Sequence, residues 1–361
     1  ANECLIRFGG DEFIVLAAQI KTRSQIENLC QNLIQWCSSE FEVLQTKIVV
    51  SGSIGVAQAP YDGAKFKQLC RKADIAMYEA KRNGRNRFEF YDVRFDEESD
   101  EKFSLIQRLR PAVQANALAV YYQPLIDLKT GNICALEALL RWPQEDGSMI
   151  FPDRFIPLAE SSGLIDTLGA WVLNQACMFC AKQQQNGNSE LSIAVNLSFA
   201  QFKDGNLPQI VKGALETSQL APEHLELELT ESILADDNGN VIQQLEQIKS
   251  LGVTFAIDDF GTGYSNLNYL RTFSAQKLKI DRIFINTLGF DEKDVPLVTA
   301  IISIAESLGM ATVAEGIENE AALKKITEMG CDIGQGYYWS KPVPAEQIER
   351  LIEAQSPTNQ R

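Results

Sequence analysis

The chain has 361 residues and is acidic, because 33 Lys and Arg against 48 Asp and Glu give a formal net charge of −15. Its 45% of hydrophobic residues excludes an intrinsically disordered protein, and its length predicts about two to three domains. The negative balance excludes a general nucleic-acid binder, which needs a basic face, and the single histidine, His224, excludes a metal site built from several histidines.

The cysteines indicate a reducing compartment. Eight of them are scattered without the spacing of a disulfide framework, so we expect free thiols and a cytoplasmic protein. For Cys177 and Cys180 a redox or zinc role is the alternative, but helical spacing beside Trp171 favours a place in a core. No uncharged apolar run reaches the roughly 18 residues of a membrane span, so no membrane contact is expected of this fragment. The chain starts at Ala1 without a methionine, and we expect a longer natural protein that is anchored, if at all, through its missing amino-terminal regions.

The amino-terminal region alternates short strands with helices, which predicts a small α+β domain. The expected elements are, in order, a hairpin over 4–18 with a Gly-Gly turn, a helix within 22–41, one strand within 46–60 and a helix from 66 that ends just before Gly84.

A charge-dense stretch over 93–102 marks the domain boundary and leads into a connecting helix. The sequence therefore divides into a partial first domain, a connector helix that overlaps the start of a large domain, and a tail. The expected bounds are 1–95, 96–117, 103–352 and 353–361.

From about residue 118 the chain repeats an apolar strand followed by an amphipathic helix. Eight such strands predict a (β/α)8 barrel of the TIM type; a doubly wound sheet is the alternative, but it needs fewer strands or another domain. Only residues 129–132 separate the first two strands, too few for a helical crossover. We therefore expect an irregular barrel whose first strand pair is antiparallel.

Polar side chains recur at the carboxyl ends of these strands, where a TIM-type barrel holds its active site. They are Glu137 with Arg141, Asn196, Glu228 with Glu231, Asp258 with Asp259, Lys279 with Asp281, Glu315 and Gln335. Taken singly, each has an ordinary explanation, such as a salt bridge for Glu228, a helix cap for Asn196 or a surface position for Lys279. Acids or amides at the ends of seven strands nevertheless favour one convergent site.

Convergent carboxylates need neutralising charge, and Arg141 and Lys279 are the only cationic side chains in this set. We therefore predict two divalent cations, Mg²⁺ or Mn²⁺, because ligands made only of oxygen favour these ions over zinc. Because Asp258 and Asp259 are adjacent, one of their carboxylates can bind both ions while the other binds a single ion. This is the arrangement of two-metal phosphoester hydrolysis.

Residues 103–352 resemble an EAL domain, the family that hydrolyses the bacterial second messenger cyclic di-GMP. The family motifs stand here in order as YYQP, EALLRW with Glu137-Ala138-Leu139, VNLS, ELTES, DDFGTGYS, LKID, AEGIE and QGYYWSKP. The resemblance implies two sets of metal ligands, which share one aspartate. They are Glu137, Asn196, Glu228 and Asp258 for one ion, and Asp258, Asp259 and Glu315 for the other.

The same resemblance implies further roles. Lys279 would contact the attacking water and Gln335 would help to orient it, while Arg141, Gln123 and Asp281 would contact the substrate. The guanine contacts are expected around loop 337–342, without assigned residues. A cyclic-guanylate-specific phosphodiesterase that opens cyclic di-GMP to linear pGpG is thus expected; a catalytically silent receptor is the alternative, although such receptors usually lack metal ligands that this chain keeps.

In the family, a loop after the fifth strand links the site to a homodimer interface. Here it is the segment 260–267, and Glu231 would secure it, so a homodimer through the barrel domain is expected. Asn266 stands where the family commonly has a second serine, a departure that leaves every implied metal ligand intact.

The segment Gly9-Gly10-Asp11-Glu12-Phe13 resembles the signature of the GGDEF family, the diguanylate cyclases, and residues 81–87 match its second landmark. The resemblance implies a metal ligand in Asp11, an active-site acid in Glu12, and phosphate contacts from Lys81 and Arg85.

The first half of that family's domain would precede Ala1, so we expect no whole cyclase site here and an exposed sheet edge with apolar surface. The region is then a truncated cyclase or a regulatory module that binds GTP, and a bifunctional cyclase and phosphodiesterase stays open for the full-length protein.

Overall fold

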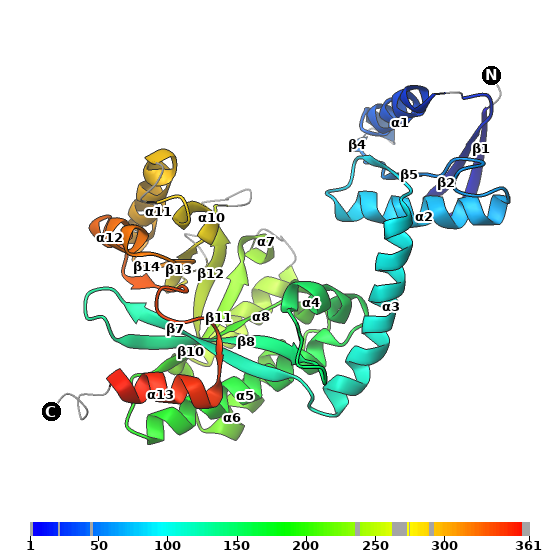
Figure 1. The fold of residues 1–361 in the computed structure, drawn as a ribbon. Helices are drawn as coiled ribbons and strands as arrows, with labels where there is room; N and C mark the ends of the chain where they lie inside the picture. Colours follow the sequence, from blue (N-terminus) through cyan, green and yellow to red (C-terminus); the bar gives the residue numbers. More distant parts are fainter. Residues whose placement is uncertain are drawn as a thin grey trace. The chain divides into compact units, whose positions relative to one another are not determined.

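The computed structural model describes residues 3–20, 22–43, 46–234, 239–261, 273, 275–288 and 292–355. The chain divides into two compact units, Ala1–Ser104 and Leu105–Arg361 (Figure 1).

The first unit begins with the predicted hairpin. Strands β1 (Glu3–Gly9) and β2 (Glu12–Ala17) pair antiparallel around a turn in which Gly10 has φ 52°, a left-handed value that suits glycine. Leu5 and Phe8 are each 68% exposed, and Phe13 and Leu16 are exposed as well. The hairpin therefore carries the exposed apolar surface that the sequence predicts for this region.

The rest of the first unit confirms the two helices and corrects one strand. Helix α1 (Arg23–Cys37) begins at the Thr22 cap, and α2 (Phe66–Arg82) ends just before Gly84. The prediction of one strand within 46–60 is wrong, because the Ser-Gly-Ser segment 51–53 interrupts it. The resulting strands have different partners: β4 (Thr46–Val49) pairs antiparallel with β3 (Glu40–Val43), and β5 (Ile54–Val56) pairs parallel with β6 (Phe88–Phe90).

The division between the units falls within one helix, α3 (Val93–Gln114). In the first unit Lys102 forms an ion pair with Glu79 of α2 at 3.3 Å. In the second unit Leu105 and Leu109 are buried in the barrel core. Each half of α3 therefore contributes contacts to its own unit.

The second unit is a closed barrel of eight strands. These are β7 (Ala119–Asp127), β8 (Ile133–Pro143), β10 (Ser192–Asn196), β11 (Leu225–Thr230), β12 (Thr254–Phe260), β13 (Lys277–Ile280), β14 (Ala311–Ala314) and β15 (Ile333–Gly334). Strands β8 and β10 to β15 run parallel in this order, and β7 closes the ring by pairing antiparallel with both β8 and β15. The irregular barrel with an antiparallel first pair is confirmed.

Helices follow the strands and pack on them; α11, for example, contacts β13 and β14. The described helices of this unit are α4 (Pro152–Ser161), α5 (Ile165–Gln185), α6 (Leu207–Ser218), α7 (Glu231–Leu234), α8 (Gly239–Ser250), α10 (Arg282–Ile285), α11 (Val295–Ser307), α12 (Glu320–Glu328) and α13 (Ala345–Gln355), with single turns of 3-10 helix at Phe199–Phe202, Pro222–His224 and Glu292–Asp294. Two short strands, β9 (Met149–Ile150) and β16 (Val343–Pro344), extend the sheet beyond the ring. Within the described ranges, no helix has the length and apolar character to cross a bilayer.

The cysteine pair of α5 lies in the core. Cys177 and Cys180 are fully buried, and burial raises the pKa of each thiol to about 12. Such thiols are unreactive, so the interpretation of this pair as core packing is confirmed.

The place of α3 in the barrel core is testable with two substitutions on one helix. Leu109→Ala deletes a fully buried side chain and is expected to lower the free energy of unfolding of the barrel unit by roughly 2–5 kcal/mol. Gln107→Ala, at an exposed position of the same helix, is expected to change it by less than about 0.5 kcal/mol. Urea unfolding followed by tryptophan fluorescence measures both, and equal effects would contradict this packing.

Candidate active site

The strand ladders bring the predicted residues to one end of the barrel. Asn196 ends β10 opposite Glu228 of β11, and Asp258 of β12 lies opposite Thr230. After β14 the backbone N–H of Glu315 donates to the carbonyl of Ile280 at 3.1 Å. Because β7 is antiparallel, it places Gln123 opposite Glu137, and Gln335 follows β15. Closure of the ring thus assembles the site.

Lys279 lies at the centre of four acids. Its Nζ is 2.6 Å from Glu315, 2.8 Å from Glu228, 3.1 Å from Asp258 and 4.0 Å from Glu137. Its side chain is 1% exposed, which excludes an ordinary surface lysine. A buried ammonium with this many carboxylate neighbours offsets part of a large local negative charge.

Amide side chains hold Glu137 from both sides. Asn196 Nδ2 donates to Glu137 Oε1 at 2.7 Å, and Gln335 Nε2 donates to Glu137 Oε2. Gln335 Nε2 also donates to Gln123 Oε1 at 3.1 Å, while Gln123 Nε2 donates to the carbonyl of Ser340 at 3.1 Å. This chain of hydrogen bonds fixes both carboxylate oxygens of Glu137 without adding charge.

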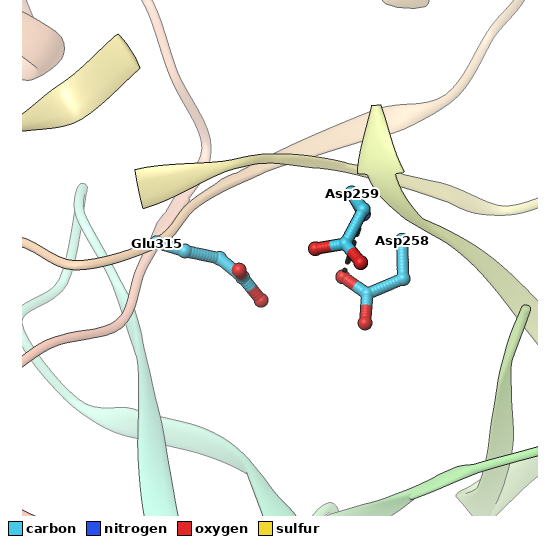
Figure 2. A group of neighbouring side chains, drawn as sticks. All are labelled: Asp258, Asp259 and Glu315. Carbon is cyan, nitrogen blue, oxygen red and sulfur yellow. Dashed lines mark hydrogen bonds between the residues drawn. The ribbon is translucent and has the colours of Figure 1, made fainter. Parts of the chain in front are cut away.

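Asp258, Asp259 and Glu315 form a group in which one carboxylate oxygen of each residue lies within 4.8 Å of those of the other two (Figure 2). Successive residues of a strand normally point to opposite faces. Asp259 departs from this rule with φ 54°, a left-handed conformation that aspartate tolerates, and its N–H donates to Asp258 Oδ1 at 3.0 Å. The turn therefore lets neighbouring carboxylates contribute to one group.

We call Glu137, Glu228, Asp258, Asp259 and Glu315 the carboxylate cluster. Burial raises the pKa of Glu228 well above its ordinary value, against the opposing effect of Lys279. Burial, together with the charge of Asp258, raises the pKa of Glu315 to about 8 and that of Asp259 to about 6, against the opposing effect of Lys279. Burial alone would lower the pKa of Lys279, but the surrounding carboxylates raise it well above its ordinary value. The single positive charge of Lys279 therefore does not balance the carboxylates of the cluster.

The donor set fits divalent cations of the Mg²⁺ and Mn²⁺ type. It consists of carboxylate oxygens and the amide oxygen of Asn196, with no thiolate or imidazole among its members. Glu228 Oε1 is buried and has no hydrogen-bond partner among the residues that the structure describes. A buried acceptor without a donor is costly, and a cation would satisfy it.

Arg141 lies beside aromatic rings next to this cluster. Its guanidinium is 5.9 Å from the ring centroid of Tyr121 and 5.6 Å from that of Phe151, and its Nη1 donates to the carbonyl of Leu140. Burial lowers its pKa, although Glu137 opposes this effect. The loop 337–342 presents exposed Tyr337 and Tyr338. Their contacts with any ligand stay a prediction.

Two predicted residues differ in their contacts: Asp281 is hydrogen-bonded within the chain, whereas Glu231 has no hydrogen-bond partner among the described residues. Asp281 caps α10 by accepting from the N–H of Ile283 at 2.7 Å, and it shares a hydrogen bond with Asp259. The carboxylate oxygens of Glu231 are buried without a hydrogen-bond partner in the described parts of the chain. Residues 262–267 of the loop that Glu231 was expected to secure, Asn266 included, lie outside the described residues.

Sequence reasoning missed the carbonyl of Ser340, because a backbone acceptor in a loop carries no side-chain signal. The alternative that Asn196 caps a helix is wrong, since Ser198 caps the turn Phe199–Phe202.

In the first unit the turn residues Asp11 and Glu12 are exposed. Lys81 and Arg85, at the other landmark, are exposed too.

The comparisons with known proteins agree on the family. The family model of the EAL domain matches residues 106–342, and that of the diguanylate cyclase GGDEF domain matches residues 1–87. MucR of Pseudomonas aeruginosa, named a bifunctional diguanylate cyclase/cyclic di-GMP phosphodiesterase, is 39% identical over 348 residues, which are 96% of this chain and 51% of MucR. PdeR of Escherichia coli, named a cyclic di-GMP phosphodiesterase, is 33% identical over 349 residues, 97% of this chain and 52% of PdeR.

A solved structure described as the PaMucR phosphodiesterase in complex with c-di-GMP is 42% identical and superposes with a TM-score of 0.65, covering 68% of this chain and 99% of that one. The chain spans about half the length of these curated relatives. It belongs to the EAL-domain family, with a GGDEF region preceding the EAL barrel.

Proposed function

We propose that the barrel unit hydrolyses cyclic di-GMP to linear pGpG with the help of two divalent cations, Mg²⁺ or Mn²⁺. The observation that carries the proposal is the carboxylate cluster, in which acids from separate strands surround Lys279 and exceed it in charge. The names of the relatives point to the same substrate.

In this proposal Glu137, Asn196, Glu228 and Asp258 hold one ion. Asp258 is shared with the second ion, whose other ligands are Asp259 and Glu315. The ions would supply Lewis-acid chemistry, making a water more acidic and offsetting negative charge on the phosphoryl group and the leaving oxygen. In the reaction the water oxygen bonds to phosphorus, the bond from phosphorus to the 3′ oxygen breaks, and the leaving oxygen gains a proton.

The remaining side chains of the site position the reactants. The Lys279 ammonium would hold the attacking water by a hydrogen bond. Gln335 Oε1, which is buried without a partner in the described structure, would accept a second one. The guanidinium of Arg141 would fix the dianionic substrate, and Gln123 and Asp281 would contact the substrate as well.

A receptor that binds cyclic di-GMP without cleaving it is the alternative, and the full set of implied metal ligands favours the enzyme. For residues 1–95, which match the GGDEF model over 1–87, we propose a regulatory module. Cyclase activity, which the name of MucR includes, is a separate proposal.

The activity is tested by incubating the protein with cyclic di-GMP and Mg²⁺ or Mn²⁺ and following pGpG by chromatography. Turnover is expected from the unsubstituted protein. Glu137→Ala removes a proposed ligand and is expected to lower kcat/KM by about a hundredfold or more. Loss of a residue that only hydrogen-bonds to a metal ligand already lowers metal affinity or activity by about 10- to 100-fold. The control Cys177→Ala, a buried thiol away from the cluster, is expected to keep the activity.

Micromolar binding without turnover in either metal would favour the receptor instead. Equal activity of the Glu137 and Cys177 variants would overturn the assignment of the site.

The metal site is tested by the melting temperature after removal of metal with a chelator. Adding Mn²⁺ to about 100 times its Kd is expected to raise Tm by roughly 5–10 °C. Asp258→Asn, which alters the shared ligand, is expected to abolish this rise. Asp146→Ala, an exposed acid in the turn before β9, is expected to keep it. A rise of the same size in both variants would show that the ion binds elsewhere.

The proposed homodimer is tested by light scattering, where a mass of about twice 40.2 kDa is expected. Helices α10 and α11, which follow the loop, carry exposed apolar side chains at Ile283 (61%) and Leu297 (43%). Ile283→Lys is expected to shift the mass toward the monomer, whereas Phe199→Lys, at another exposed apolar position, is expected not to. A monomeric mass of the unsubstituted protein at assay concentration would count against the dimer.

A further inference from the structure

The Lys279 ammonium contacts three of the carboxylates that the proposed function assigns to the metal ions. It lies 2.6 Å from Glu315 Oε1 and 3.1 Å from Asp258 Oδ1, and both residues belong to the group of carboxylates in Figure 2. A third contact, at 2.8 Å, goes to Glu228 Oε2. One ammonium thus already contacts proposed ligands of both ions.

We infer that Lys279 competes with divalent cations for the carboxylate cluster, so that metal binding is an exchange in which the ammonium gives up its contacts to Asp258 and Glu315. The inference rests on the proposed metal site. Mg²⁺ holds its oxygen ligands at about 2.0–2.1 Å, which brings an ion bound to these oxygens close to the ammonium. Like charges at such short range repel strongly, so both cations cannot keep these contacts.

The charge balance of the metal-bound cluster accommodates a lysine at this position. With both ions bound and all five carboxylates ionised, the carboxylates contribute −5, Lys279 contributes +1 and the two divalent cations contribute +4, which sums to zero. Lysine suits such an exchange, because its ammonium is a point charge on a flexible stem and needs no fixed geometry. Lys279 therefore lowers the affinity for metal while reducing the repulsion among the acids.

The barrel provides an internal comparison two residues earlier on the same strands. Lys277 of β13 pairs with Glu226 of β11 at 3.0 Å, just as Lys279 pairs with Glu228. Glu226 is the only acid that forms an ion pair with Lys277 among the described residues. Lys277 thus lies on the same strand as Lys279 and also pairs with a glutamate, but it lies outside the carboxylate cluster.

The test is the affinity for Mn²⁺, measured by calorimetric titration of chelator-treated protein, together with Tm before and after the addition of Mn²⁺. Lys279→Met is expected to bind Mn²⁺ about tenfold more tightly or better, with a lower Tm without the ion and a larger rise on its addition. Lys277→Met is expected to lower Tm with and without Mn²⁺ equally and to leave the affinity unchanged. A purely structural lysine at 279 would behave like Lys277.

Two further measurements keep the inference testable if Lys279→Met does not fold. Lys279→Gln keeps a hydrogen-bonding side chain but removes the charge, and it is expected to bind Mn²⁺ more tightly as well. In the unsubstituted protein with isotope-labelled lysine, Mg²⁺ is expected to shift the NMR signal of the Lys279 side chain and not that of Lys277.

Equal or weaker Mn²⁺ binding by the neutral variants, with binding by the unsubstituted protein intact, would overturn the exchange alone. An unshifted Lys279 signal at saturating Mg²⁺ would do the same. No Mn²⁺ binding by the unsubstituted protein would overturn the proposed metal site, and the exchange with it.

Discussion

The interaction on which the second unit depends is the contact of one buried ammonium with several carboxylates inside the barrel. Burying like charges is costly, and Lys279 offsets only part of that cost. The acids come from β8, β11, β12 and the segment after β14, so they meet only if the ring closes. Closure in turn requires the antiparallel β7, which pairs with β8 and β15. The irregular start of the barrel is therefore a condition for the site.

Two lysine–glutamate pairs on the same strands show that neighbours decide the chemistry. Glu226–Lys277 and Glu228–Lys279 have nearly equal distances, 3.0 and 2.8 Å. The first is a single pair, whose charges offset each other. The second shares its lysine with acids from other strands, which leaves a net negative charge. An isolated pair leaves no net charge, whereas the surplus of acids makes a site that attracts cations.

The sequence predicts the barrel well, because each strand is an apolar run and the short segment 129–132 permits only a hairpin. The acids were found because strand ends of a barrel converge. The central place of Lys279 was not, since spacing fixes where a strand ends but not which oxygens a long flexible side chain reaches. The same limit applies to Asp281, which caps α10, and to the carbonyl of Ser340, which binds Gln123. The break between β4 and β5 was missed because a glycine between serines was read as part of a strand.

The amides on the other side of the site follow from the same electrostatic constraint. Asn196 and Gln335 fix Glu137 through hydrogen bonds from neutral donors, and Gln123 holds Gln335 by accepting a hydrogen bond from it. A carboxylate at any of these positions would add repulsion to a cluster that already exceeds its lysine in charge, and a lysine there would compete further with cations. An amide orients Glu137 and leaves the charge unchanged. The site thus separates two tasks, with acids providing the charge that attracts cations and amides providing the geometry.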